Sequence, residues 1–245
     1  MKIAVLSDLH ANGDALDAVV RELGRRRPDR VYHLGDLVGY NAEPEKCVRW
    51  AMENTAGGVC GNHDAVACGR SSGMDFHEAA RTAALWSRDH LTKESREYLA
   101  ALPNRLDAGG CALLVHGSQG DPDRYIHSVE QAAEELASPP ASGPDGPVFF
   151  GHTHVAGGFV RRAGGGIEHV PPGKFRLSKG DRALLNPGSV GQPRDRNPDA
   201  SFLLFDAEAR EVTWIRVPYD IDAARAKVIA AGLPSFFAHR LLDGM

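Results

Sequence analysis

Five short segments of the chain concentrate side chains that can bind metal ions. They are Asp8-Leu9-His10, Gly35-Asp36, Gly61-Asn62-His63-Asp64, Val115-His116-Gly117-Ser118 and Gly151-His152-Thr153-His154. Carboxylate, imidazole and amide ligands without a thiolate suit Mn, Fe, Zn or Ni. The set exceeds what one ion needs and fits two divalent ions that share a carboxylate. Two such ions can generate hydroxide at neutral pH and clamp a phosphoryl group during in-line attack.

Each segment alone is a weak signal. D-x-H occurs a second time at Asp75-Phe76-His77, where no strand precedes it, and we interpret that copy as an accident of composition at the start of a helix. G-N-H-D is more specific, because glycine permits a tight turn and successive polar side chains after a buried strand are costly without a partner. The inference of a metal site therefore rests on the joint occurrence of all five segments, each after an apolar run.

The elements that must position these segments alternate in the first half. Strands are predicted at 2–6, 30–34, 58–60 and 111–116. Helices are predicted at 44–52, at 78–101 in one or two pieces, and at 128–137; Leu16, Val19, Val20 and Leu23 also recur on one helical face. This alternation predicts an α/β fold with parallel strands, whose carboxyl ends gather the segments at one sheet edge.

The second half contains strands without intervening helices. A loop is expected at 138–147, followed by strands at 148–150, 156–162, 166–170, 182–186, 201–206 and 211–217, with a hairpin turn at Gly164-Gly165-Gly166. Helices are predicted at 221–232 and 234–242. Because the metal-binding segments lie in both halves and must meet, one domain over 1–245 with two packed sheets is the simplest arrangement. The C-terminal helices at 220–245 are expected to pack on it.

The composition excludes several classes of protein. Lys and Arg number 28 against 32 Asp and Glu, for a net charge of -4, which provides no basic groove for long nucleic acid. No apolar run approaches the ~20 residues that span a bilayer, and the first apolar run is too short for a signal-peptide core. The four cysteines show no C-x-x-C spacing, which favours reduced thiols. We expect a cytoplasmic protein with no membrane partner, and the oligomeric state stays open.

In these five segments the chain resembles the calcineurin-like metallophosphoesterase superfamily, whose pattern is D-x-H, G-D, G-N-H-[DE], H and G-H-x-H. It is also similar to a bacterial branch of phosphodiesterases and phosphatases, both in the segment from Gly35 to Tyr40 and in the segment from Asn186 to Arg194. The resemblance covers most of the chain. It implies a four-layer α-β-β-α sandwich with two mixed sheets and a site for two divalent metal ions.

The resemblance also implies a role for each site residue. One metal would be held by Asp8, His10 and His154, and the other by Asn62, His116 and His152, with Asp36 bridging the two. A metal-bridging water would be the nucleophile. His63 would not bind metal; it would face the phosphate and protonate the leaving oxygen.

One departure from the family pattern bears on the substrate. Many members carry G-D-x-x-D-R, in which the second Asp orients the catalytic histidine and the Arg grips phosphate, whereas this chain has Gly39 and Tyr40 there. Without that bidentate clamp we expect a small phosphate ester, with a diester or nucleotide-like substrate preferred. Arg194 could replace the clamp or be a solvated loop residue, and Tyr40 could line the pocket or only pack. A phosphomonoesterase, including a protein phosphatase, and a catalytically silent metal-binding scaffold remain the alternatives.

Three polar residues near the segments have simpler interpretations. Asn12 is expected to cap the first helix, with contact to substrate as the alternative. His33 is expected to be a hydrogen-bonded core residue. Asp64 is expected to be a turn or cap residue that points away from His63.

Overall fold

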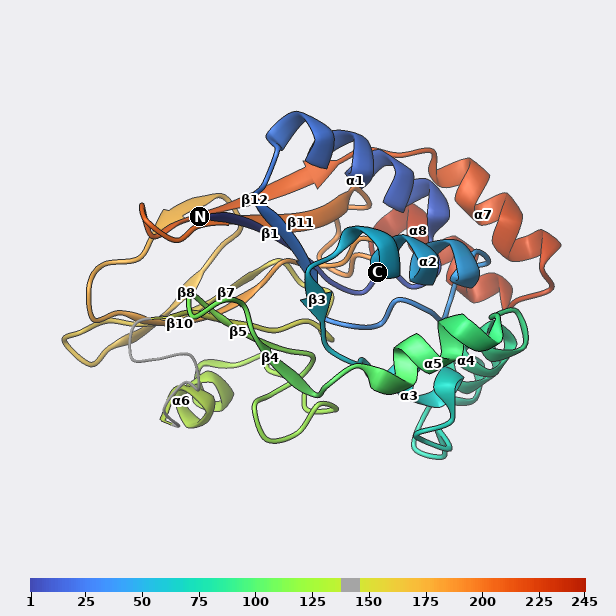
Figure 1. Ribbon diagram of the computed structural model, residues 1–245, viewed down its shortest axis with the longest axis horizontal. Helices are drawn as coiled ribbons and strands as arrows, with labels where there is room; N and C mark the ends of the chain where they lie inside the picture. Colours follow the sequence, from blue (N-terminus) through green and yellow to red (C-terminus); the bar gives the residue numbers. More distant parts are fainter. Residues whose placement is uncertain (138–145) are drawn as a thin grey trace.

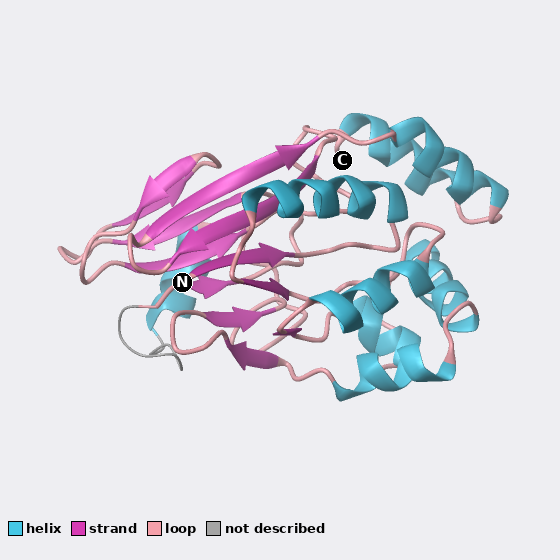
Figure 2. Ribbon diagram, turned by 45° about the horizontal axis from the view of Figure 1, so that its top comes forward, coloured by secondary structure: helices cyan, strands magenta, loops and turns pink. Residues whose placement is uncertain are grey.

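The computed structural model describes residues 1–137 and 146–245, and these form two six-stranded mixed sheets packed face to face (Figure 2). The first sheet has the order β3 (Gly57–Gly58), β2 (Arg30–His33), β1 (Lys2–Leu6), β11 (Ala200–Asp206), β12 (Glu211–Val217), β9 (Lys174–Arg176). Its first three strands are parallel and the others antiparallel. The predicted loop at 138–147 lies, except for its last two residues, outside the described chain.

The second sheet is built mainly from the later half of the chain. Its order is β4 (Arg105–Asp107), β5 (Leu113–Val115), β6 (Val148–Phe149), β10 (Arg182–Asn186), β7 (Gly157–Arg161), β8 (Ile167–Val170). Strands β5, β6 and β10 are parallel, and β7 and β8 form the hairpin expected around the glycine triplet. Strands β4 and β9 were not predicted, because each has only three residues and no clear alternation of polar and apolar side chains.

The described residues form eight helices around the two sheets. They are α1 (Gly13–Arg26), α2 (Pro44–Asn54), α3 (Asn62–Cys68), α4 (Glu78–Asp89), α5 (Lys93–Ala101), α6 (Val129–Ala137), α7 (Ile221–Ala230) and α8 (Ser235–Asp243). Figure 1 shows α1 and α6 on opposite sides of the paired sheets, with α3 to α5 gathered at one end. The arrangement is the expected four-layer α-β-β-α sandwich.

Strand β1 illustrates why the layers form. Ile3 and Val5 point into the interior shared by the two sheets, whereas Ala4 and Leu6 point into the core beneath α1 and α2. A strand that is covered on both faces needs apolar residues at every position, which explains the unbroken run from Ile3 to Leu6. On the far side, Leu113 and Val115 of β5 pack with α6 residues such as Leu136.

The two C-terminal helices pack against elements that carry the metal-binding segments. Helix α7 contacts α1, and Lys227 forms ion pairs of 2.8 Å with Asp14 and 2.7 Å with Glu43. Phe237 of α8 is buried and its ring centroid lies 4.7 Å from that of Tyr40. The end of the chain thus lies beside the segment that follows Asp36. Among the described residues, no helix is both long and apolar enough to cross a membrane.

Candidate dimetal site

The proposed ligands lie just beyond strand ends, as the sequence predicts. Asp8 and His10 follow β1 and Asp36 follows β2 in the first sheet, while His116 follows β5 and His152 follows β6 in the second. Both strand pairs are parallel, so their carboxyl ends meet where the two sheets converge. Asn62 differs from the expectation of a turn after a strand, because it begins the short helix α3.

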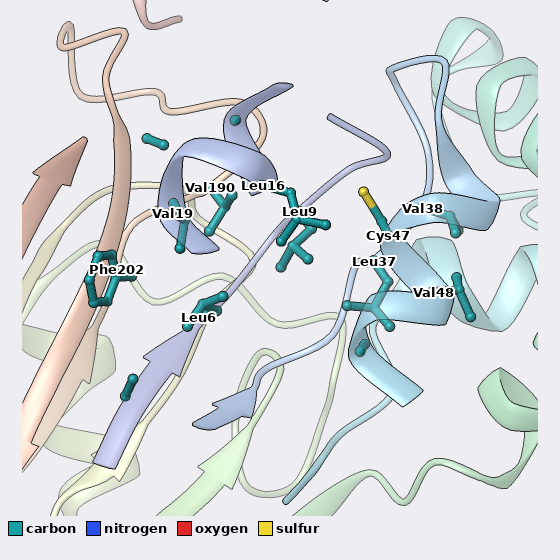
Figure 3. Close-up of a cluster of buried hydrophobic side chains, with 14 of the residues drawn as sticks. Leu6, Leu9, Leu16, Val19, Leu37, Val38, Cys47, Val48, Val190 and Phe202 are labelled. Carbon is teal, nitrogen blue, oxygen red and sulfur yellow. The ribbon is translucent and has the colours of Figure 1, made fainter. Parts of the chain in front are cut away.

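Apolar residues between the ligands anchor the segments to the core. Figure 3 shows Leu9, Leu37, Val38 and Val190 among the side chains of the cluster beneath α1 and α2. All four are fully buried, and each comes from one of the loops around the site. Each of these apolar side chains is buried in the core next to a ligand or loop residue of the site. Burial of the apolar neighbour therefore fixes the direction in which the ligand side chain points.

Most of the proposed ligands have an unusual backbone conformation. Asp8, His10, Asp36, His152 and His154 all have φ between 45° and 66°. For residues other than glycine this region costs of order 1–3 kcal/mol each and persists only where the surroundings enforce it. Asp64 supplies part of that enforcement, because its carboxylate accepts hydrogen bonds from the backbone N–H groups of Leu37, Val38 and Gly61.

The side chains form two groups with a shared carboxylate. Asp8, His10, Asp36 and His154 make the first, and Asp36, His116 and His152 make the second. Oδ2 of Asp36 lies 3.5 Å from His10 Nε2 and 3.4 Å from His116 Nε2, between the two groups. The side-chain oxygen of Asn62 lies 3.0 Å from His116 Nε2, which adds it to the second group.

The hydrogen bonds of the four imidazoles orient their lone pairs toward one another. Nδ1 of His10, His116 and His154 donates to the carbonyl oxygens of Val38 (2.9 Å), Leu34 (2.7 Å) and Gln192 (2.6 Å), and Nε2 of His152 donates to that of Asp123 (3.1 Å). Each remaining ring nitrogen then faces the centre: His10 Nε2 lies 3.0 Å from His154 Nε2, and His116 Nε2 lies 3.2 Å from His152 Nδ1. Such backbone bonds fix the tautomer of metal-bound histidines. The donor set therefore fits two divalent ions.

The ionisation of the site also suits metal binding. Burial favours the neutral carboxyl form of Asp8 and Asp36, but the histidines around them hold both pKa values below their ordinary range. Burial lowers the pKa of His10 and His154, and lowers that of His152 to about 3. Ionised carboxylates and neutral imidazoles are the forms that bind metal. His116 differs: burial lowers its pKa, but the Asp36 carboxylate outweighs this and raises it to about 10.

His63 lies beside these groups and makes a contact that the sequence did not predict. Its Nε2 lies 3.0 Å from the hydroxyl of Tyr40, which accepts a hydrogen bond from Arg194 Nη2 at 3.2 Å. Nδ1 of His63 has no hydrogen-bond partner within the described chain. A Cβ atom on Gly39 would lie only 2.3 Å from that nitrogen, so the glycine leaves room for the ring.

A cavity of about 540 Å³ opens beside Asn62, His63 and His152. Its walls include Phe76, whose ring centroid lies 4.8 Å from that of His63, and Tyr125, at 3.9 Å from that of His152. This volume is typical of small-molecule sites. We call this space the reaction cavity.

Sequence reasoning missed two aromatic residues of the site, Phe76 and Tyr125, and part of the role of Asp64. Phe76 and Tyr125 carry no local signal of a cavity wall. Asp75-Phe76-His77 precedes α4 as expected, and His77 caps that helix, yet all three residues line the reaction cavity. Asp64 has the cap role that was expected, but it also supports the backbone after Asp36. Asp64 in the first turn of α3, whose carboxylate accepts a hydrogen bond from the Gly61 N–H, is the local signal of a helix start.

The other polar residues singled out in the sequence have mainly structural contacts. Asn12 caps α1 by accepting from Ala15 N–H and donates to the carbonyl of Gly191. His33 is buried and lies 3.0 Å from the hydroxyl of Tyr98. Asn186 donates to the carbonyl of Gly151 and Ser189 to that of Asp8. These bonds join the loops that present the ligands.

Comparison with known proteins shows that this fold is shared over the whole chain. A crystallised metallophosphoesterase from Sphaerobacter thermophilus is 37% identical, covers 100% of this chain and 99% of its own, and superposes with a TM-score of 0.85. A hypothetical protein from Pyrococcus horikoshii shares the fold at 20% identity, with 100% and 98% coverage and a TM-score of 0.78. An uncharacterized protein of Methanocaldococcus jannaschii is 31% identical over 99% of this chain and 98% of its own length.

The family match covers the proposed site and every strand of the two sheets except β12. The profile of the calcineurin-like phosphoesterase superfamily domain matches residues 1–210, which include every proposed ligand as well as Tyr40 and Arg194. Helices α7 and α8 lie beyond this match. The sequence pattern, the sandwich and the two Asp/His groups lead to the same conclusion: this chain belongs to the calcineurin-like phosphoesterase superfamily.

Proposed function

We propose that the chain is a dimetal phosphodiesterase that hydrolyses small or nucleotide-like phosphate esters. The observation that carries the proposal is the orientation of the four imidazoles, whose ring protons go to backbone carbonyls and whose lone pairs converge on Asp8 and Asp36. Two divalent ions held there would lower the pKa of water and neutralise charge on phosphoryl oxygens.

Residues of the chain would orient the ester and supply the proton. Asn62 borders both the second metal group and the reaction cavity, so its amide can contact a phosphoryl group and a metal together. His63 faces the same cavity and would give a proton to the leaving oxygen. Tyr40 holds Nε2 of that ring at 3.0 Å and thereby sets its direction.

The preference for a diester rests on the cations around the reaction cavity. Among the described residues, Arg70 is the one arginine that lines it, and its guanidinium is occupied by the carbonyl of Leu102 (2.7 Å) and the side chain of Asn104 (2.9 Å). Arg194 lies behind Tyr40. A diester carries one charge and a monoester at neutral pH carries nearly two, so a cavity without a free guanidinium favours the diester.

A side-by-side rate measurement tests this function. Metal-stripped protein is reloaded with Mn²⁺ and given bis(p-nitrophenyl) phosphate or p-nitrophenyl phosphate, with Asp36→Asn protein purified in parallel as a control for contaminants. We expect metal-dependent turnover that is faster on the diester and absent in the variant. Faster monoester turnover would replace the proposal by a phosphatase. No turnover on either ester, with two ions bound, would indicate a silent scaffold.

A further inference from the structure

A second, smaller hollow adjoins the reaction cavity behind Tyr40. Its volume is about 220 Å³, and it shares Tyr40, His77 and Ala80 with the reaction cavity. The remaining wall includes Arg194 and three residues of α8, Phe236, Phe237 and Arg240. We call it the α8 hollow. Because the two spaces have a common wall at Tyr40, a ligand that is too large for the metal centre alone can extend from one into the other.

The α8 hollow is rich in unpaired positive charge. No carboxylate of residues 1–137 or 146–245 lies within 4.0 Å of the guanidinium of Arg194 or Arg240. Nη2 of Arg194 donates hydrogen bonds to the neutral side chains of Tyr40 and Gln192, each at 3.2 Å. Nε of Arg194 is buried without a hydrogen-bond partner among the described residues. Burial and the nearby charge of Arg194 both lower the pKa of Arg240. Two neighbouring guanidiniums without a carboxylate partner are suited to binding an anion in this hollow.

An exposed aromatic ring completes the α8 hollow. Phe236 is 51% exposed, and the guanidinium of Arg240 lies 4.7 Å from its ring centroid. The neighbouring Phe237 is buried against Tyr40, so α8 is held in place while Phe236 stays open to solvent. A flat ligand ring can therefore stack on Phe236 or on the guanidinium plane next to it.

We propose that the α8 hollow binds the part of the substrate beyond the scissile phosphoryl, and that this part carries a flat ring and a second anionic group, as a nucleotide does. The inference rests on the proposed function, because it places the first phosphoryl at the dimetal site. Arg194 and Arg240 then recognise the second anion and leave the scissile phosphoryl to the metals. Helix α8, which lies outside the family match, acts as a specificity element.

Calorimetric titration of the Mn²⁺-loaded protein tests the α8 hollow directly. The ligands are adenosine 5′-monophosphate, adenosine 3′,5′-bisphosphate and inorganic phosphate. We expect the bisphosphate to bind about tenfold more tightly than the monophosphate, as a charge-assisted contact provides. Arg240→Gln should abolish most of that ratio, with Arg240→Lys intermediate. Phe236→Ala should weaken both nucleotides and leave the affinity for inorganic phosphate unchanged.

A matched control removes the same charge elsewhere. Arg21 is exposed on α1 and lines neither space, so Arg21→Gln should keep the wild-type ratio. Equal binding of the two nucleotides by the wild-type protein, or a ratio that survives in Arg240→Gln, would overturn the inference. Turnover of bis(p-nitrophenyl) phosphate separates the two proposals. Protein without turnover that shows the Arg240-dependent ratio refutes only the enzyme, and active protein without the ratio refutes only the α8 hollow.

Discussion

Restoring the family's aspartate at Gly39 should damage this protein rather than improve it. An aspartate there orients the catalytic histidine in many members of the superfamily, so Gly39→Asp would seem to provide His63 with a missing partner. Gly39 has φ of +90°, and its Cβ would lie 2.3 Å from Nδ1 and 3.0 Å from Cγ of His63. The ring cannot easily retreat, because Phe76 and His10 lie 4.8 and 4.9 Å away between ring centroids.

Two costs combine in this variant. A positive φ at a residue other than glycine costs of order 1–3 kcal/mol, and forcing an extra atom into a packed site costs about 1–3 kcal/mol. The free energy of unfolding should therefore fall by roughly 2–6 kcal/mol, which lowers Tm by about 4–24 °C in a chain of this size. Displacement of His63 should remove the general-acid contribution, typically about 10²–10⁴-fold in kcat.

Gly39→Ala is the matched control, since it adds the same Cβ without the carboxylate. Both variants are compared with wild type for bound Mn²⁺, Tm and kcat on a diester with an alkyl leaving group. We expect both to keep their metal and to lose stability and rate together. The reasoning is refuted if Gly39→Asp equals or exceeds wild type while Gly39→Ala is inactive, because the ring would then have turned to use the new carboxylate.

Three further predictions concern other buried groups. Asp36→Asn should weaken binding of both metals and abolish turnover, because it removes the shared charge; two ions still present by elemental analysis would contradict the bridging role. His63→Ala should keep its metals but slow hydrolysis by roughly 10²–10⁴-fold with alkyl leaving groups and less with nitrophenolate; equal losses would count against the acid role. Burial lowers the pKa of His33 from 6.5 to about 3, so the unfolded chain binds its proton first as pH falls. The free energy of unfolding of the wild type should therefore fall as pH drops from 6.5 toward 3, more steeply than that of His33→Gln. The extra slope is at most about 1.4 kcal/mol per pH unit. Equal pH dependences of the two proteins, measured by urea unfolding at each pH, would exclude this effect.

The placement of the proposed ligands could be predicted because it depends on local features. The run Lys2–Leu6 is apolar at nearly every position, so it is a strand that is covered on both faces and ends where Ser7 and Asp8 begin. The same argument places Asp36, His116 and His152. Parallel strands bring such ends together without any knowledge of the contacts between them.

The helix α3 shows where local reasoning failed. Asn62 and His63 follow a short apolar run, which favours a strand followed by a turn. The helix has only seven residues, too few to show helical periodicity, and at its start the Asp64 carboxylate accepts a hydrogen bond from the Gly61 N–H. As a result the interpretation of Asp64 was incomplete, although its cap role was expected.

The contacts around Tyr40 could not be predicted, because they join distant parts of the chain. Tyr40 meets His63, Arg194 and Phe237, which follow it by 23 to nearly 200 residues in the sequence. Neither hydrophobic periodicity nor a sequence motif predicts such long-range contacts. The α8 hollow is unpredictable for the same reason, since Arg194 and Arg240 come from a loop and a helix that show no joint pattern.

These contacts explain how Gly39 and Tyr40 can stand in place of the Asp-Arg pair found in many family members. Loss of the aspartate side chain at Gly39 leaves space that the ring of His63 occupies, and Tyr40 takes over the orientation of that ring from the Nε2 side. The hydroxyl of Tyr40 in turn accepts a hydrogen bond from Arg194 Nη2 at 3.2 Å, while the backbone N–H of Arg194 donates to the carbonyl of His154. Arg194 lines the α8 hollow and not the reaction cavity, so under the proposed function it would contact the substrate away from the scissile phosphoryl. Under the two proposals, the substrate is selected by what lies beyond the reacting phosphorus, where α8 contributes Phe236 and Arg240.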